Sequence, residues 1–135
     1  MDTVKILIVD DDRDMVDTTR CFLETKGYSV QVAYDPDQGF ARLEEEVPDL
    51  AILDVMMGRG AGGFVLARKI RKETRFDHMA IVMLTGIREQ TGFSFPSDDP
   101  KHPEFLPVDE FLEKPLALPV LLEKIQQQLL KISGK

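Results

Sequence analysis

Residues 5–12 read KILIVDDD, and this stretch decides the fold because an apolar run ends abruptly in three acidic residues. An unbroken apolar run, without the alternation of a half-exposed strand, is typical of a strand buried on both faces of a parallel sheet. The sequence therefore predicts a strand over Lys5–Val9, with the carboxylates of Asp10, Asp11 and Asp12 at its carboxyl end.

Short apolar runs recur along the chain and alternate with stretches of helical periodicity. Further strands are expected at residues 28–33, 50–53, 80–84 and 111–113. Helices are expected at residues 13–26, 35–46, 64–72 and 119–132, and a glycine-rich loop at 58–63. This alternation predicts an α/β fold with a doubly wound, five-stranded parallel sheet, right-handed crossovers and helices on both faces.

The helical patterns also predict which side chains are buried. The last helix is expected to face the core with six apolar residues: Val120, Leu121, Leu122, Ile125, Leu129 and Leu130. The single cysteine, Cys21, lies beside Phe22 and Leu23 in the first helix, so a buried thiol is expected rather than a reactive one.

Length and charge narrow the possible classes of protein. The 135 residues suit one domain over positions 1–135 with one core. The net charge of -7 argues against a general nucleic-acid binder, because phosphate backbones attract basic surfaces. No signal-like leader and no apolar run of membrane-spanning length are found, so a cytoplasmic setting without membrane contact is the default expectation.

Polar residues with a shared chemical logic follow four of the predicted strands. Asp10 and Asp11 follow the first, Asp54 the third, Thr85 the fourth and Lys114 the fifth. The carboxyl ends of parallel strands lie on one edge of a sheet, where such folds carry their sites. Crowded carboxylates need a cation, and oxygen-only ligands favour Mg²⁺. A carboxylate there could also attack phosphorus and form an aspartyl phosphate, with the metal, the lysine and the hydroxyl sharing the phosphoryl charge.

Four motifs at these strand ends carry a resemblance to a known family. They are IVDD at residues 8–11, LDVMM at 53–57, MLTG at 83–86 and FLEKP at 111–115. In this order and spacing the sequence resembles the receiver domains of bacterial two-component response regulators, including the chemotaxis type. The resemblance implies a flavodoxin-like strand order of 2-1-3-4-5 and a switch that is phosphorylated by a histidine kinase or a phosphotransfer protein.

The resemblance also implies roles for the matching positions around the metal. Asp54 would be the phosphoacceptor and would itself contact Mg²⁺. Asp11 would be a direct Mg²⁺ ligand, and Asp10 would act mainly through water. The backbone carbonyl of Met56 would be a further ligand, and Lys114 would contact a phosphoryl oxygen.

Two further residues would make the switch, again by resemblance. Thr85 would bond the phosphoryl group and move toward it on activation. Phe111 stands where such domains carry a switch aromatic that is coupled to the threonine. Phosphorylation would then change a surface that binds a downstream protein or a second copy of the chain.

The chain departs from the family pattern in two places. The proline that usually follows the phosphoacceptor by four residues is replaced by Gly58, and the loop is one residue longer. The segment between Thr85 and Lys114 is also longer, and it contains four prolines at positions 96, 100, 103 and 107. Because proline is incompatible with a helix interior, the fourth helix is expected to be short, displaced or disordered.

Several alternatives stay open or are set aside at this point. A receiver fold that is no longer phosphorylated would be a pure interaction module. An aspartate-nucleophile phosphatase is also possible, because Asp10-x-Asp12 resembles the nucleophile motif of haloacid-dehalogenase-type enzymes, although the chain is short for one. The GxGxxG match at residues 58–63 follows the third strand rather than the first, which argues against a dinucleotide site. His78 and His102 lie in polar contexts and are expected at the surface.

Overall fold

A computed structural model describes residues 3–55, 57, 62–85, 108–114 and 117–133 of the chain. Five strands form its sheet: β1 (Lys5–Val9), β2 (Ser29–Ala33), β3 (Leu50–Asp54), β4 (Ala80–Thr85) and β5 (Glu110–Glu113). Four α-helices and one 3₁₀ turn join them: α1 (Arg13–Thr25), α2 (Pro36–Glu45), α3 (Gly62–Arg71), η1 (Thr74–Phe76) and α5 (Leu118–Ser133).

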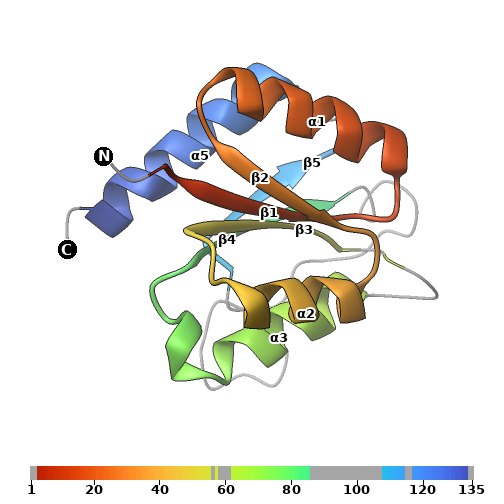
Figure 1. Cartoon of the computed structure of the whole chain (residues 1–135), viewed down its shortest axis with the longest axis vertical. Helices are drawn as coiled ribbons and strands as arrows, with labels where there is room; N and C mark the ends of the chain where they lie inside the picture. Colours follow the sequence, from red (N-terminus) through yellow and green to blue (C-terminus); the bar gives the residue numbers. More distant parts are fainter. Residues whose placement is uncertain (1–2, 56, 58–61, 86–107, 115–116, 134–135) are drawn as a thin grey trace.

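The strands are all parallel and lie in the order β2-β1-β3-β4-β5 (Figure 1). This confirms the doubly wound sheet and its strand order. The predicted ends of the strands and helices differ from the observed ends by no more than two residues, which is the usual uncertainty at element termini.

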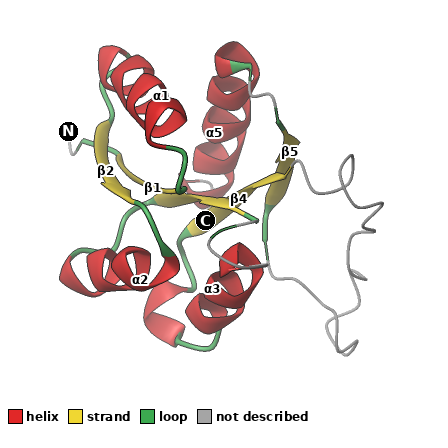
Figure 2. Cartoon of the chain, turned by 90° about the vertical axis from the view of Figure 1, so that its right-hand side faces the viewer, coloured by secondary structure: helices red, strands yellow, loops and turns green. Residues whose placement is uncertain are grey.

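Helices cover both faces of the sheet, with α1 and α5 on one face and α2 and α3 on the other (Figure 2). Successive residues of β1 alternate between the two sides. Ile6 and Ile8 pack with Val16 of α1, whereas Leu7 and Val9 belong to the cluster around α2 and α3. The four aliphatic residues of β1 are therefore all buried, which explains why this strand reads as an unbroken apolar run.

The helix starts follow from capping residues in the sequence. Asp12 lies at the N-cap of α1, and its carboxylate accepts a hydrogen bond of 3.1 Å from the backbone N–H of Met15. Asp35 does the same for α2, accepting from Gln38 at 2.8 Å, with Pro36 in the first turn. After α1, Gly27 has φ of 93°, a conformation that favours glycine.

The predictions for buried helix residues were partly wrong. Cys21 is exposed, because the buried face of α1 is formed by Val16, Thr19 and Leu23, and position 21 lies on the opposite side of the helix. Val120 is 45% exposed and Leu130 is 72% exposed for the same reason. In α5 the buried positions are Leu121, Ile125 and, unexpectedly, Gln128, which is 3% exposed; these recur at intervals of three to four residues.

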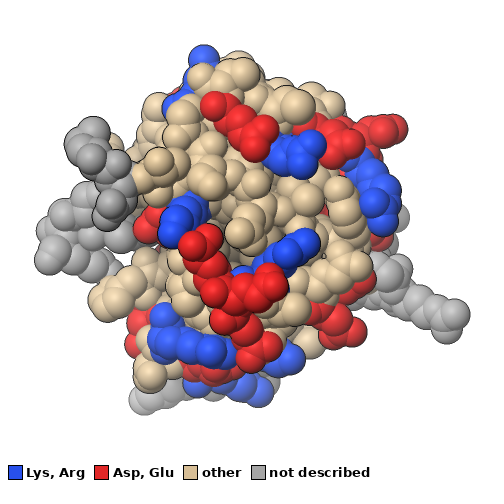
Figure 3. Space-filling model, in the orientation of Figure 1, with Lys and Arg blue, Asp and Glu red and all other residues tan. Residues whose placement is uncertain are grey.

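Other expectations concern the two histidines, the fourth helix and membrane spans. His78 is exposed, as predicted, whereas His102 lies outside the described residues. The prediction of a short, displaced or disordered fourth helix falls within residues 86–107, which also lie outside them. Acidic and basic side chains are interspersed on the face shown in Figure 3. Within the described ranges, none of the helices combines the length and apolar character that a membrane span requires.

Candidate functional site

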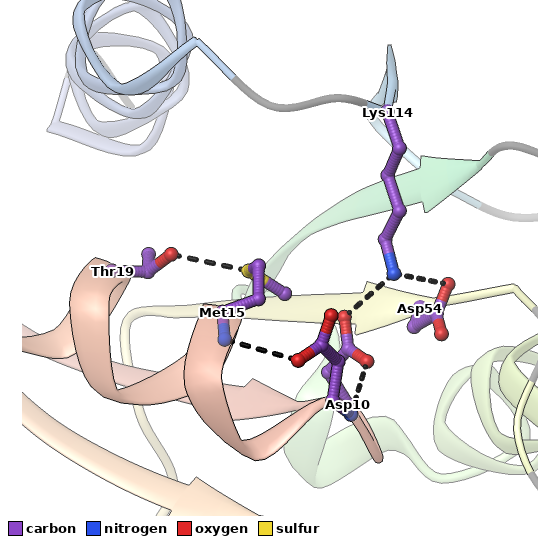
Figure 4. Close-up of polar contacts among 6 residues, drawn as sticks. Asp10, Met15, Thr19, Asp54 and Lys114 are labelled. Atoms are coloured by element: carbon purple, nitrogen blue, oxygen red, sulfur yellow. Dashed lines mark hydrogen bonds and ion pairs between the residues drawn. The ribbon is translucent and has the colours of Figure 1, made fainter.

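The carboxyl ends of three strands bring two carboxylates and one ammonium group together (Figure 4). Asp10 follows β1, Asp54 ends β3 and Lys114 follows β5. Nζ of Lys114 lies 3.0 Å from Oδ2 of Asp10 and 3.3 Å from Oδ1 of Asp54. Residues that are 104 positions apart in the chain thus share one ion-pair cluster, because β1 and β5 flank β3 and β4 in a parallel sheet.

The two carboxylates are removed from water, whereas the lysine is partly exposed. Asp10 is 0% exposed and Asp54 is 5% exposed, while the side chain of Lys114 is 27% exposed. Oδ1 of Asp10 accepts a hydrogen bond of 3.0 Å from the backbone N–H of Asp12. Its Oδ2 lies 3.0 Å from Nζ of Lys114 and contacts no other donor among the described residues. Because a carboxylate oxygen can accept from more than one partner, this buried oxygen can also bind a cation.

A third carboxylate completes an acidic group at the mouth of the site. Asp11 is exposed, and one oxygen from each of Asp10, Asp11 and Asp54 lies within 4.8 Å of the others. One ammonium group cannot neutralise three carboxylates. The donors are all oxygens, which suits a hard cation such as Mg²⁺, and the exposed side of the group leaves room for water or substrate oxygens in its coordination shell.

The environment opposes ionisation of Asp54. Burial, and after it the negative charge of Asp10, raises the pKa of Asp54 to about 7, although Lys114 acts in the opposite direction. Burial lowers the pKa of Lys114, but the charges of Asp54 and Asp10 outweigh burial and hold that pKa above its usual value. The lysine is therefore a permanent cation in this site, and Asp54 is a carboxyl group that gains when positive charge arrives.

Comparison with known proteins identifies the family. The sequence profile for the response regulator receiver domain matches residues 6–126. The chain belongs to the response regulator receiver domain family. It is a domain of two-component signalling proteins, and its role is that of a signalling switch.

Individual relatives share both the sequence and the fold of this receiver domain. Regulatory protein VanRc from Enterococcus gallinarum is 38% identical over 109 residues, covering 78% of this chain and 46% of the relative. The phosphate regulon transcriptional regulatory protein PhoB from Rhizobium meliloti is 30% identical, over 93% of this chain and 52% of its own. The chain therefore spans about half the length of these curated relatives.

Solved structures agree over almost the full chain. A CheY-like receiver domain protein from Methanospirillum hungatei is 28% identical, with a TM-score of 0.78 and 98% of both chains covered. A two-component response regulator from Clostridium difficile is 30% identical, with a TM-score of 0.73, covering 94% of this chain and 96% of its own.

The other predicted site residues are placed less completely. The backbone of Thr85 ends β4 and pairs in register with Glu113 of β5, but its side chain is outside the described part. Met56 lies outside it as well, so its carbonyl stays a prediction. Phe111 lies in β5, is partly buried, and packs against the apolar cluster under α2 and α3.

Gly63 supports the site in a way that the sequence did not reveal. Its backbone N–H donates a hydrogen bond of 3.0 Å to the carbonyl of Val55, so the first turn of α3 lies directly against the end of β3. A Cβ at position 63 would overlap the carbonyl oxygen of Asp54 and lie 2.7 Å from its carbonyl carbon. The prediction of a loop through residue 63 was therefore wrong, and this glycine serves close packing of helix and strand.

Asp109 is a second residue that the sequence reading missed. Its Oδ2 accepts a hydrogen bond of 2.7 Å from the backbone N–H of Ile81 and lies 2.9 Å from Nη2 of Arg71. Its own N–H donates to the carbonyl of Ile81 at 2.8 Å. These contacts fix the start of β5 against β4, and thereby the strand that carries Lys114 into the site.

The titration of Asp54 should report the opposing charges around it. In the metal-free protein its carboxyl carbon resonance should move with a pKa of about 7. Asp10→Asn removes a negative neighbour and should lower this pKa, whereas Lys114→Met removes a positive one and should raise it. An Asp54 that titrates near its ordinary value of 3.8 in all three proteins would refute this electrostatic description.

The raised pKa also has a consequence for stability. Ionisation of Asp54 should lower the free energy of unfolding progressively as the pH rises from about 4 to about 7.

Substitution of Gly63 should disturb the end of β3 more than substitution of its neighbour. Gly63→Ala should lower the free energy of unfolding by roughly 1–3 kcal/mol, because its Cβ meets backbone that cannot move freely. At Gly62 a Cβ would lie 2.9 Å from the ring of Pro36 and 3.2 Å from the carbonyl oxygen of Met57, which is less close than the overlap at Gly63. Gly62→Ala is therefore the matched control with a smaller loss, and urea unfolding measures both. Equal stabilities for the two variants would contradict the proposed packing role.

Proposed function

We propose that residues 1–135 act as a single receiver domain that accepts a phosphoryl group on Asp54, with Mg²⁺ held by the acidic group. The observation that supports this most directly is the contact of one lysine with two buried carboxylates beside an exposed third. The phosphoryl group would come from a histidine kinase or a phosphotransfer protein, in a cytoplasmic setting.

The proposed reaction assigns each group in the cluster a distinct task. A carboxylate oxygen of Asp54 forms a bond to phosphorus while the bond to the donor breaks, and the leaving group departs with the electron pair. Lys114, already 3.3 Å from Asp54, compensates charge on the phosphoryl oxygens. Bound Mg²⁺ would supply further positive charge to the same oxygens, with Asp10, Asp11, Asp54 and the carbonyl of Met56 as its proposed protein ligands.

The switch would pass from the site to β4 and β5. Thr85 and Phe111 are the proposed switch residues, and the strands that carry them are adjacent in the sheet. A phosphoryl group that draws Thr85 inward would leave room for movement of the aromatic side chain and so change the neighbouring surface. A downstream protein or a second copy of the chain would recognise that change; we propose no direct contact with nucleic acid or membrane.

The domain would act on itself rather than turn over a metabolite. Self-catalysed transfer to Asp54 and slow hydrolysis of the product are the only reactions proposed. The phosphatase alternative needs Asp12 as a second acid in the cleft, but its carboxylate caps α1 through Met15. The described site offers no observation that favours an unphosphorylated interaction module.

Phosphorylation gives the first test. Incubation of the chain with acetyl phosphate and Mg²⁺ should add one phosphoryl group to the intact mass. Asp54→Asn should show no adduct while it keeps the fold, because the amide is nearly isosteric but is not a nucleophile. Omission of Mg²⁺ should also prevent the reaction.

Two outcomes would overturn the assignment. An adduct that persists on Asp54→Asn would place the acceptor elsewhere, and a folded chain without any adduct would favour the interaction module. Circular dichroism on the same samples separates loss of chemistry from loss of fold.

The acidic run at residues 10–12 offers a matched pair for the metal. Asp11→Asn should weaken Mg²⁺ binding by about tenfold or more, the loss expected when a direct ligand is removed. Asp12→Asn should bind Mg²⁺ nearly as well, because asparagine still caps α1 and position 12 is outside the acidic group. Calorimetric titration measures both affinities, and equal affinities would remove Asp11 from the proposed ligands.

A further inference from the structure

Met15 differs from the other methionines that the structure describes. Met57, Met79 and Met83 are no more than 3% exposed and belong to the apolar cluster under α2 and α3. Met15 lies in the first turn of α1 and is only half-buried. It borders a hollow of about 270 Å³, whose other lining residues are Asp14, Thr18, Thr19 and Leu118. Of these four thioethers, that of Met15 is therefore the one that a small molecule can approach.

The sulfur of Met15 is bound by a buried hydroxyl group. Oγ1 of Thr19, one turn further along α1, donates a hydrogen bond of 3.2 Å to Sδ of Met15 (Figure 4). Thr19 is 1% exposed, and within the described ranges the sulfur is the acceptor of its hydroxyl. A thioether is a weak acceptor. The buried hydroxyl therefore gains if a stronger acceptor takes the place of the sulfur.

We propose that Met15 is a site of oxidation by peroxides, and that Thr19 binds the oxygen of the resulting sulfoxide. With hydrogen peroxide, a lone pair of the sulfur attacks one peroxide oxygen while the O–O bond breaks. The proton of the attacked oxygen passes to the departing one, which leaves as water. The sulfur loses two electrons and the peroxide gains them, so the product is methionine sulfoxide and no other reactant is needed.

The contact with Thr19 explains why the oxidised chain keeps its fold. Oxidation of a methionine in an apolar core places a polar oxygen where no donor awaits it, and so disrupts packing. At Met15 a donor is already in place, and the hollow provides room for one more atom. The unbranched side chain has three rotatable bonds, so the sulfur can react from the hollow and then direct its new oxygen to the hydroxyl of Thr19.

Two hydrogen bonds connect Met15 to the acidic group. Its backbone N–H donates to Asp12 at 3.1 Å, and the N–H of Asp12 donates to Oδ1 of Asp10 at 3.0 Å. Oxidation therefore adds a polar oxygen to the surface beside the acidic group without changing any residue of that group. The inference goes beyond phosphoryl transfer, because neither Met15 nor Thr19 takes part in the proposed reaction at Asp54.

Peptide mapping by mass spectrometry tests the selectivity of oxidation on the full, folded chain. Graded hydrogen peroxide should oxidise Met15 at least about tenfold faster than Met57, Met79 and Met83, because those three are closed to solvent. In urea the four rates should become similar, which would show that the fold causes the difference. Equal rates in the folded chain would overturn the proposal. Asp54→Asn should be oxidised at Met15 as the original chain is, so that failure of this proposal and failure of the phosphorylation proposal are distinguishable.

A cycle of variants tests the role of Thr19. Thr19→Val is close in shape to threonine but has no hydroxyl, whereas Thr19→Ser keeps the hydroxyl and is the matched control. Oxidation at Met15 should lower the unfolding temperature by about 3 °C or more beyond the loss in the original chain when residue 19 is valine, and by no more than the original loss when it is serine. Met15→Leu, treated in the same way, corrects for oxidation elsewhere. Equal losses in the original chain and in Thr19→Val would overturn the assignment to Thr19.

Nuclear magnetic resonance gives a readout that needs no variant at position 19. When Met15 is oxidised, the hydroxyl proton of Thr19 should move downfield and exchange more slowly with water, because a sulfoxide oxygen accepts more strongly than a thioether. The resonances of Thr25, whose hydroxyl donates to the carbonyl of Phe22 on the same helix, should stay where they are. Unchanged Thr19 resonances in the oxidised chain would overturn the proposal.

Discussion

The ion pairs of Lys114 with Asp10 and Asp54 are the interaction on which the rest of this structure depends. Two carboxylates that are nearly inaccessible to water could not remain ionised side by side without a cation. That cation follows β5, so the site exists only when β1, β3, β4 and β5 have assembled in order. The cluster therefore links the correct closure of the sheet to the chemistry at its edge.

The positions of these three groups rest on backbone contacts around them. Gly63 lets α3 press against the carbonyl of Asp54, and Asp109 holds the start of β5 on Ile81. Neither residue touches the reacting group. Gly63 instead restrains β3, which ends at Asp54, and Asp109 restrains β5, which leads to Lys114. Restraining these strands fixes the positions of the charged groups relative to one another.

The strands and the acidic cluster could be predicted because their signals are local. An apolar run followed by an acid records both a buried strand and the residue at its end, and sheet topology then brings such ends together. Burial around a helix was predicted less well, because α5 is apolar at so many positions that its sequence does not fix the buried side. Val120 and Leu130 were expected in the core but are exposed, and the burial of Gln128 was not predicted. The role of Asp109 was invisible because its partner, Ile81, is 28 residues away.

The balance of charge at the sheet edge also indicates how the site would change when Asp54 is modified. Three carboxylates face one ammonium group, and burial together with the negative charge of Asp10 raises the pKa of Asp54 to about 7. A phosphoryl group on Asp54 would add more negative charge to the same place. The modified state can therefore be stable only if additional positive charge enters with it, whether as a metal ion or through donors drawn in from β4 and β5. Movement of Thr85 toward the site would then follow from the charge added at Asp54 and would need no separate cause.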